Sequence, residues 1–253
     1  PKPEQVVRRL SVMGRSRRGW SDADLPLLDE ARALLLGPPQ QYGHVIVDEA
    51  QDLTPMQLRM VARRAGGAFT VLGDIAQATG PVGYGRWDEL LPHLPGGEGV
   101  EVEELRHAYR VPREIMSVAL PLLERIAPEV EPPVAYRTGA EPPRVVAAED
   151  PLGAAFDEAA RLSGEEGLLA VIAPASLRGD GETALFDDTR IAVLTPREAK
   201  GMEFDHVIVV EPDRIVREAV EGQGLRELYV ALTRPTTTLV LVHSRPLPAE
   251  LGL

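Results

Sequence analysis

Seven short runs of strand-forming residues recur along this chain, and stretches of helical periodicity separate most of them. Runs rich in Val, Ile and Leu predict strands, and several are apolar on both faces, as buried parallel strands are. The alternation therefore predicts an α/β fold with largely parallel sheets. The runs are HVIVDE (44–49), FTVLGD (69–74), RVVAAED (144–150), LLAVIAP (168–174), RIAVLT (190–195), DHVIVVEP (205–212) and TLVLVHS (238–244).

The length of 253 residues is enough for two domains of ordinary size. Stretches rich in Pro and Gly at 92–99 and 129–143 predict loops or joints. We place the domain boundary near Leu105, which gives a first domain over 1–105 and a second over 106–253.

Composition limits the chemistry that the chain can perform. There is no cysteine, so any metal must be held by oxygen or histidine. Neither a membrane-spanning apolar run nor a signal peptide is recognisable, which predicts a cytoplasmic protein without a membrane partner.

The net charge of -12 opposes strong binding to polyanions, so nucleic acid would need a local basic groove. One basic cluster, which we interpret as a solvated helix face rather than a binding patch, contains Arg8, Arg9, Arg15, Arg17 and Arg18.

The run HVIVDEAQD (44–52) leads from apolar residues directly into a group of carboxylates. Asp48 and Glu49 follow the predicted strand, and ligands of open α/β sheets bind at the carboxyl ends of strands. Such a pair can hold Mg2+ while one carboxylate orients or deprotonates an attacking water. The alternative is that these acids only cap the turn before the next helix. We interpret HVIVDE as a buried parallel strand, and a shorter echo, HVIVVEP (206–212), predicts a counterpart strand of similar burial without the acidic pair.

The run FTVLGDIAQ (69–77) supplies a second strand with polar residues at its end. Gly73 would allow a close approach of the backbone, and Asp74 could join a network of metal and water. Gln77 could report on a bound phosphate by hydrogen bonding. Alone, the pair Gly-Asp is a turn signal, and its value lies in following VDEAQD.

Two helices have readable ends. Thr54, Pro55 and Gln57 fit a capping box at the start of one helix, and Gly66-Gly67 predicts its end. Near the C-terminus, one helical face is formed by Leu225, Leu228, Tyr229 and Leu232. Pro235 stops that helix, which puts Arg234 at a helix end beside a loop.

Five strings in order resemble motifs II to VI of the UvrD/Rep/PcrA-like superfamily 1 helicases: VIVDEAQD, TVLGDIAQ, AYRVPREI, AKGMEFDHVIV and ELYVALTRP. The resemblance covers nearly the whole chain. It implies two RecA-like domains, an ATP site between them and ATP hydrolysis with Mg2+.

The resemblance also implies roles for single residues. Asp48 would hold Mg2+, Glu49 would act on the attacking water, and Gln77 would sense the γ-phosphate. Arginine suits phosphoryl transfer because its permanent, planar charge can cancel the charge that develops on phosphate. Arg110 and Arg234 match the two arginines of that kind. The residues that match nucleotide contacts are Tyr109, near the base, and Gly201 and Glu203 of motif V.

The chain also departs from the family pattern. The phosphate-binding loop G-x-x-x-x-G-K-[ST] is absent, so the first domain is expected to be incomplete, with an upstream part of the same polypeptide as its partner. The chain alone is therefore expected to be inactive. Too few residues separate AYRVP from AKGMEF for a duplex-engaging insertion. Where helicases of the family carry base-stacking aromatics, this chain has ATGPVGYGRW, and we interpret Tyr84 and Trp87 as packing residues.

Within the family, the strings GDIAQATGP, ELRHAYRVPREIM and REAKGMEFDHVIVVEPDRI look most like the HelD-like branch. That resemblance implies an ATPase that releases bacterial RNA polymerase from nucleic acid, with the polymerase as partner. One alternative is a UvrD-like DNA helicase or translocase. Another is a motor-like module without catalysis that only binds protein.

Overall fold

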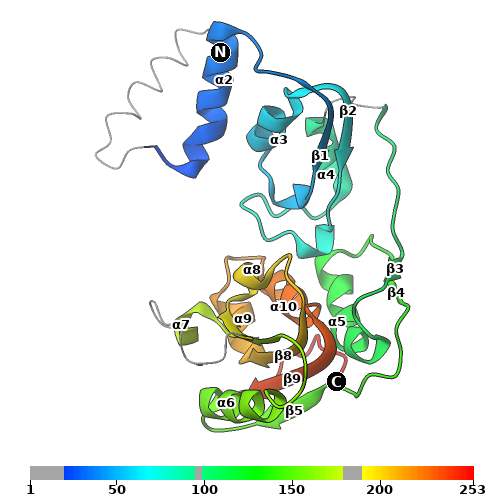
Figure 1. Ribbon diagram of the computed structural model, residues 1–253, viewed down its shortest axis with the longest axis vertical. Coiled ribbons are helices and arrows are strands. Elements are labelled where there is room, and N and C mark those ends of the chain that lie inside the picture. The colour runs from blue at the N-terminus through cyan, green and yellow to red at the C-terminus, as the bar shows by residue number, and fades with distance from the viewer. Residues whose placement is uncertain (1–19, 95–98, 179–189) are drawn as a thin grey trace. The chain divides into compact units, whose positions relative to one another are not determined.

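The computed structural model describes residues 20–94, 99–178 and 190–253, and Figure 1 shows their helices and strands. The basic cluster between Arg8 and Arg18 lies outside the described residues. The chain divides into two compact units. The first extends to Ile75 and includes Gly80–Val102, and the second combines Ala76–Thr79 with Glu103–Leu253.

The first unit is built on two parallel strands, β1 (Tyr42–Val47) and β2 (Ala65–Val71), paired in register from His44 opposite Ala68 to Val47 opposite Val71. The crossover between them contains η2 (Ala50–Asp52) and α3 (Pro55–Ala62). The other elements of this unit are η1 (Asp22–Asp24), α2 (Leu25–Leu36), α4 (Trp87–Leu90) and η4 (Leu91–His93), and η3 (Ile75–Gln77) spans the border with the second unit.

Helix α3 begins as predicted but ends earlier. The Thr54 hydroxyl accepts a hydrogen bond from the Gln57 backbone N–H at 3.2 Å, and the Gln57 side chain accepts one from the Thr54 N–H at 2.8 Å. The prediction that Gly66-Gly67 ends this helix is wrong, because both glycines lie in β2. A Cβ on Gly67 would lie 2.4 Å from the Gly43 carbonyl oxygen, so the glycine permits close approach of the two strands.

The prediction that β1 is a buried strand is also wrong. Only Val47 of this strand is buried, and the Ile46 side chain is 64% exposed. Among the described residues β1 has one neighbouring strand, β2, which is itself largely exposed. An apolar strand can therefore be recognised from its residues, whereas its burial depends on what covers it.

Helix α2 is joined to α3 by ion pairs. The Arg63 guanidinium contacts Asp29 at 2.5 Å and also contacts Glu30. Arg64 reaches Asp29 at 2.8 Å, and Arg59 reaches Glu30 at 2.9 Å. The Arg59 hydrogen bond lowers the pKa of Glu30 and outweighs the opposing effect of burial.

The second unit contains a five-stranded parallel sheet in the order β5-β9-β8-β6-β7. Its strands are β5 (Arg144–Ala147), β6 (Leu169–Ile172), β7 (Ile191–Leu194), β8 (Phe204–Val210) and β9 (Pro235–His243). A separate short pair joins β3 (His107–Ala108) to β4 (Val134–Ala135). The helices are α5 (Arg113–Ile126), α6 (Pro151–Leu162), α7 (Ala175–Arg178), α8 (Pro196–Ala199), α9 (Pro212–Glu218) and α10 (Gly224–Leu232).

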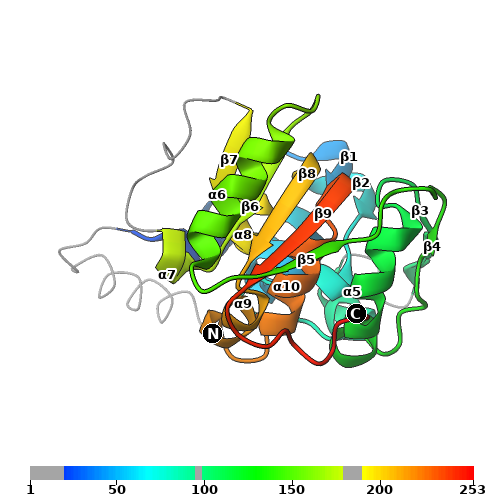
Figure 2. The same ribbon diagram turned by 90° about the horizontal axis from the view of Figure 1, so that it is seen from below.

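Helices cover both faces of this sheet. Alternate residues of β8 and β9, among them Ile208, Val210 and Val240, share a buried cluster with α6, which lies over that face in Figure 2. The residues between them, such as Val209 and Leu241, are equally buried and face the opposite side. The predicted α/β fold with parallel sheets is therefore confirmed. No helix in the described ranges is both long enough and apolar enough to span a membrane.

Candidate functional site

The predicted carboxylate pair lies directly after β1. Asp48 is exposed, and its Oδ1 accepts a hydrogen bond from the Glu49 backbone N–H at 2.8 Å. Glu49 has a left-handed backbone with φ of 53°. The turn continues with the Ala50 N–H donating to the Leu72 carbonyl at 3.0 Å. The carboxylates thus project from the carboxyl end of a strand, where α/β sheets bind ligands.

A buried amide follows this pair, and sequence reasoning missed it. The Gln51 side chain is fully buried, and its Nε2 donates to Oε2 of Glu49 at 2.6 Å. Its Oε1 accepts from the Asp74 backbone N–H at 3.1 Å. The predicted residues Glu49 and Asp74 are therefore joined within the first unit through a third residue, and Gly73 lies against the same amide.

Mg2+ fits the donor set at this strand end. In proteins Mg2+ is usually bound by one or two carboxylates, with phosphate and water completing its shell. Asp48 and Glu49 supply two such groups next to one another. The described residues contain no group of three or more His, Asp or Glu side chains that could hold a metal by themselves. The chemistry of this pair therefore suits a metal that arrives with a phosphate ligand.

In the second unit, residues from two of the predicted motifs form an exposed ion pair. The Arg110 guanidinium contacts the Glu203 carboxylate, and both side chains are largely exposed. The ring of Tyr109 lies 5.4 Å from that of Tyr136, centroid to centroid, at an angle of 42°. Tyr109 is 63% exposed and Tyr136 is 72% exposed. This surface presents a permanent positive charge beside accessible aromatic rings.

Arg234 is buried, although the sequence placed it beside a loop. It is 3% exposed, and its Nε donates to the Val230 carbonyl at 2.9 Å. Its Nη1 donates to the Met202 carbonyl at 3.1 Å, and its Nη2 donates to Oε1 of Gln77 at 2.9 Å. Gln77 and Arg234 are 157 positions apart in sequence, so the fold brings these two predicted residues together within the second unit.

Lys200 also contacts this group, and it was not among the predicted site residues. Its Nζ donates to the Gln77 backbone carbonyl, and it lies 3.4 Å from the Thr79 hydroxyl. Gly201 follows with φ of 74° and an exposed backbone. The string AKGMEF contains this lysine, so a search for positive charges within the matched strings could have found it.

Three predicted residues of the second unit lie before strands of its five-stranded sheet, whereas Tyr109 and Arg110 follow β3. Gly201 and Glu203 precede β8, and Arg234 precedes β9. These positions are at the amino ends of parallel strands, opposite to the edge at which α/β sheets usually bind ligands. Gly201, Glu203 and Arg234 therefore lie at the amino edge of their sheet, whereas Asp48 and Glu49 follow the carboxyl end of β1.

Comparison with known families gives one match. Residues 190–242 match the UvrD-like helicase C-terminal domain. This stretch runs from the start of β7 almost to the end of β9. The UvrD-like stretch contains Lys200, Gly201, Glu203 and Arg234, whereas Gln77, Tyr109 and Arg110 precede it. The second unit is therefore helicase-like over the part that holds its buried arginine.

The solved structures to which the chain is similar include three helicase structures. The C-terminal domain of a possible DNA helicase from Lactobacillus plantarum WCFS1 is 19% identical, with 56% of this chain and 91% of that chain covered and a TM-score of 0.42. The PRRSV helicase is 16% identical over 83% of this chain, with a TM-score of 0.49. The arterivirus nonstructural protein 10 helicase in complex with DNA is 20% identical over 81%, with a TM-score of 0.47.

The chain spans 37% and 40% of the two viral helicase chains. No curated protein sequence gives a significant match. The family match bears on residues 190–242 alone.

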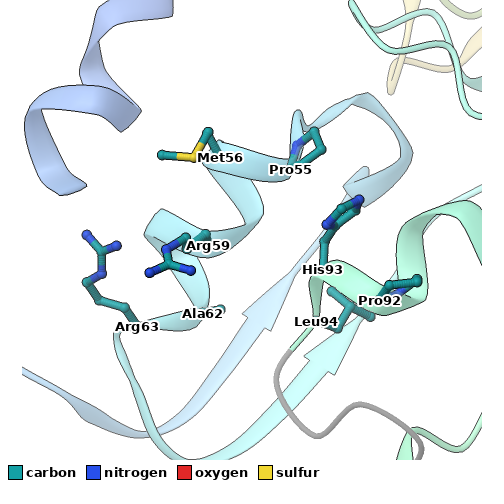
Figure 3. Close-up of a pocket in the computed structure, with 8 residues that line it drawn as sticks. All are labelled: Pro55, Met56, Arg59, Ala62, Arg63, Pro92, His93 and Leu94. Carbon is teal, nitrogen blue, oxygen red and sulfur yellow. The ribbon is translucent and has the colours of Figure 1, made fainter. Parts of the chain in front are cut away.

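One hollow of the first unit lies apart from the candidate residues. Figure 3 shows α3 on one side of it and residues 92–94 on the other, around a volume of about 610 Å3. Two of its lining side chains, Arg59 and Arg63, are already paired with acids of α2. None of the predicted site residues lines it. Its lining consists of Pro55, Met56, Arg59, Ala62, Arg63, Pro92, His93 and Leu94.

Proposed function

We propose that this chain is the C-terminal motor part of an ATP-hydrolysing, superfamily 1 helicase-like protein of the cytoplasm. The two RecA-like domains would comprise 1–105 and 106–253, and an upstream part of the same polypeptide would supply the phosphate-binding loop. The observation that carries the proposal is the cluster in which Arg234 donates to the Gln77 side chain and Lys200 to its backbone. Such a cluster suits a motor in which a phosphate-sensing amide is linked to the helicase-like stretch.

The carboxylates of the first unit would act on the nucleotide. Bound Mg2+ would cancel charge that develops on the phosphate oxygens during transfer. Asp48, which is exposed at the strand end, would hold the ion, with Asp74 in its water network. Glu49 would orient and deprotonate the attacking water. Its hydrogen bond to a fully buried amide supports this role, because a catalytic base needs a fixed position.

The two arginines would have different tasks. Arg110 is exposed and pairs with Glu203 at the surface, so it could exchange that partner for a phosphate oxygen. Arg234 is buried with its donors on two carbonyls and Gln77, which suits an arginine that holds the sensing amide in place. Tyr109 offers an exposed ring to the nucleotide base, and Gly201 provides the turn before Glu203.

The test of this assignment is ATP hydrolysis by the complete polypeptide carrying Gln77→Ala. Removing the sensing amide should lower kcat by about 10- to 100-fold, with ATP affinity little changed. Wild-type turnover in a folded Gln77→Ala protein would contradict the proposal.

The finer proposal is a HelD-like role, in which ATP hydrolysis releases RNA polymerase from nucleic acid. Three features support it: the residues of the motif strings, the short interval between Arg110 and Lys200, and the net charge of -12, which disfavours a DNA-binding groove. The complete protein should co-purify with bacterial RNA polymerase and stimulate its release from stalled complexes. Failure of both would leave an ATPase with another partner.

A second candidate is a UvrD-like DNA helicase or translocase. The observation that favours it is the exposed pair Tyr109 and Tyr136, since bases of single-stranded nucleic acid stack on such rings. This candidate requires ATP hydrolysis that single-stranded DNA stimulates, and binding that weakens steeply with salt. Absence of DNA stimulation at low salt would exclude it.

A further inference from the structure

We propose that Gln51 is a positioning residue for Glu49. Its buried amide holds the Glu49 carboxylate on one side and the backbone of Asp74 on the other. The inference rests on the proposed function, in which Glu49 acts on water. It adds a residue that neither the motif assignments nor the family match names.

The hydrogen bonds of Gln51 account for its burial. A side-chain amide is costly to remove from water unless its donor and acceptor find partners. Here Nε2 donates to a carboxylate at 2.6 Å, and Oε1 accepts a backbone N–H at 3.1 Å. A bond to a charged acceptor is stronger than one between neutral groups. The amide is therefore held at both ends, and it constrains the carboxylate that it contacts.

The space around the amide depends on a glycine. An ideal Cβ on Gly73 would lie 2.3 Å from Oε1 of Gln51 and 3.1 Å from the Trp87 ring. Any side chain at position 73 would therefore displace the amide oxygen or the ring. This packing explains why position 73 is a glycine. It also shows that the Trp87 ring packs close to the same position.

The backbone of Glu49 also needs support. Glu49 and Glu211 are the two non-glycine residues with positive φ in the described parts of the chain, and they end the two echoing runs HVIVDE and HVIVVE. Such a backbone is uncommon for non-glycine residues and depends on its surroundings. The Glu211 carboxylate accepts directly from the Ser244 N–H after the neighbouring strand β9. In the first unit, the Gln51 amide stands between Glu49 and the chain after β2.

This difference suggests what the amide contributes. A direct bond to a backbone N–H fixes a glutamate as a structural link, as for Glu211. A side-chain amide between the glutamate and the neighbouring strand also fixes the position of the carboxylate. It leaves the carboxylate farther from that strand than a direct bond would. The hydrogen bond to Gln51 comes from the backbone of Asp74, which lies three residues before Gln77. The position of Glu49, the proposed base, is therefore linked along the chain to Gln77, the proposed phosphate sensor.

The experiment compares two substitutions of Gln51 in the complete polypeptide. Gln51→Leu removes both hydrogen bonds. Gln51→Glu keeps the acceptor for the Asp74 N–H but places a carboxylate against Glu49. Both should lower kcat by about 10- to 100-fold while the Kd for ATP changes little. Hydrogen exchange of the Asp74 amide should accelerate in Gln51→Leu and stay slow in Gln51→Glu.

Two more variants keep the test decisive if Gln51→Leu fails to fold. Gly73→Ala retains the native amide but pushes on its oxygen, and it should reproduce the loss of kcat. Gln57→Ala is the matched control, because it removes a side-chain amide that caps α3 in the same unit without contacting Glu49. It should lower the melting temperature and leave kcat per folded molecule unchanged.

The results separate the inference from the proposed function. If Glu49→Gln is inactive while folded Gln51→Glu turns over at the wild-type rate, Gln51 does not position Glu49 and the proposed function stands. An equal loss in Gln57→Ala would show that any damage to this unit lowers kcat, and would also overturn the inference. If Glu49→Gln retains full turnover, the proposed function fails first.

Discussion

Arg234 carries a permanent charge in a position with almost no contact with water. A buried guanidinium is tolerated only where its donors have acceptors, and here three of its nitrogens donate to Val230, Met202 and Gln77. Because these acceptors come from three segments of the second unit, the arginine also orders the structure around Gln77. In the proposed motor, an arginine can thus contribute by holding neighbouring residues in place as well as by contacting phosphate.

Replacing Arg234 by lysine tests this role. Lysine keeps the charge but lacks the planar fork, so at least one acceptor would lose its donor. We expect Arg234→Lys to lower the free energy of unfolding by about 2–4 kcal/mol. Urea unfolding measures this, with the exposed Arg245→Lys as control. Equal stability of the two variants would contradict the structural role.

Arg110 should behave in the opposite way. It lies in an exposed ion pair with Glu203, and such pairs contribute less than about 1 kcal/mol. We expect Arg110→Ala to leave the unfolding midpoint nearly unchanged and to lower ATP hydrolysis of the complete protein by about 10^3-fold. A variant with normal turnover would remove Arg110 from the phosphate site.

At the scale of elements, β1 and β8 show how a similar sequence reaches two environments. Both runs contain HVIV, yet β8 is central in a five-stranded sheet and almost wholly buried, while β1 is exposed along most of its length. All seven predicted strands exist, because alternation of apolar runs and helices is a local property. Burial is not local, so the expected similarity of the two strands in burial is wrong.

Sequence reasoning missed Gln51 and Lys200 for a similar reason. Gln51 and Lys200 each make a hydrogen bond to a segment distant in sequence, and spacing does not reveal these contacts, although the string AKGMEF contains Lys200. The pair Gly66-Gly67 predicts a helix end because glycine often ends helices, whereas in the structure the close approach of a neighbouring strand requires Gly67. Capping of α3 was predictable, since Thr54 and Gln57 interact within one turn.

The attachment of α2 to α3 should depend on pH. The hydrogen bond from Arg59 holds the pKa of Glu30 below its ordinary value of about 4.3. The folded state therefore binds fewer protons than the unfolded state, so this stabilisation is present above the ordinary value and is lost as pH falls through the folded one. We expect protection of α2 amides from hydrogen exchange to decrease below about pH 4. Glu30→Gln should show weaker protection already at pH 7, and unchanged protection there would contradict this account.

At the scale of the whole molecule, the candidate residues divide between the two units. The first holds Asp48, Glu49 and Asp74, and the second holds the arginines with Gln77. The phosphate-binding pattern G-x-x-x-x-G-K-[ST] does not occur in these 253 residues. We expect the chain by itself to show no appreciable ATP hydrolysis. Turnover by this chain that Glu49→Gln abolishes would refute that expectation.

The most direct test of the account is ATP hydrolysis by the complete polypeptide with and without Glu49→Gln. The amide keeps the size of the side chain but cannot take a proton from water. Hydrolysis should fall by at least about 100-fold, while ATP should still bind with near-normal affinity. Retained turnover in a folded Glu49→Gln protein would contradict the role of the strand-end carboxylates and, with it, the proposed motor.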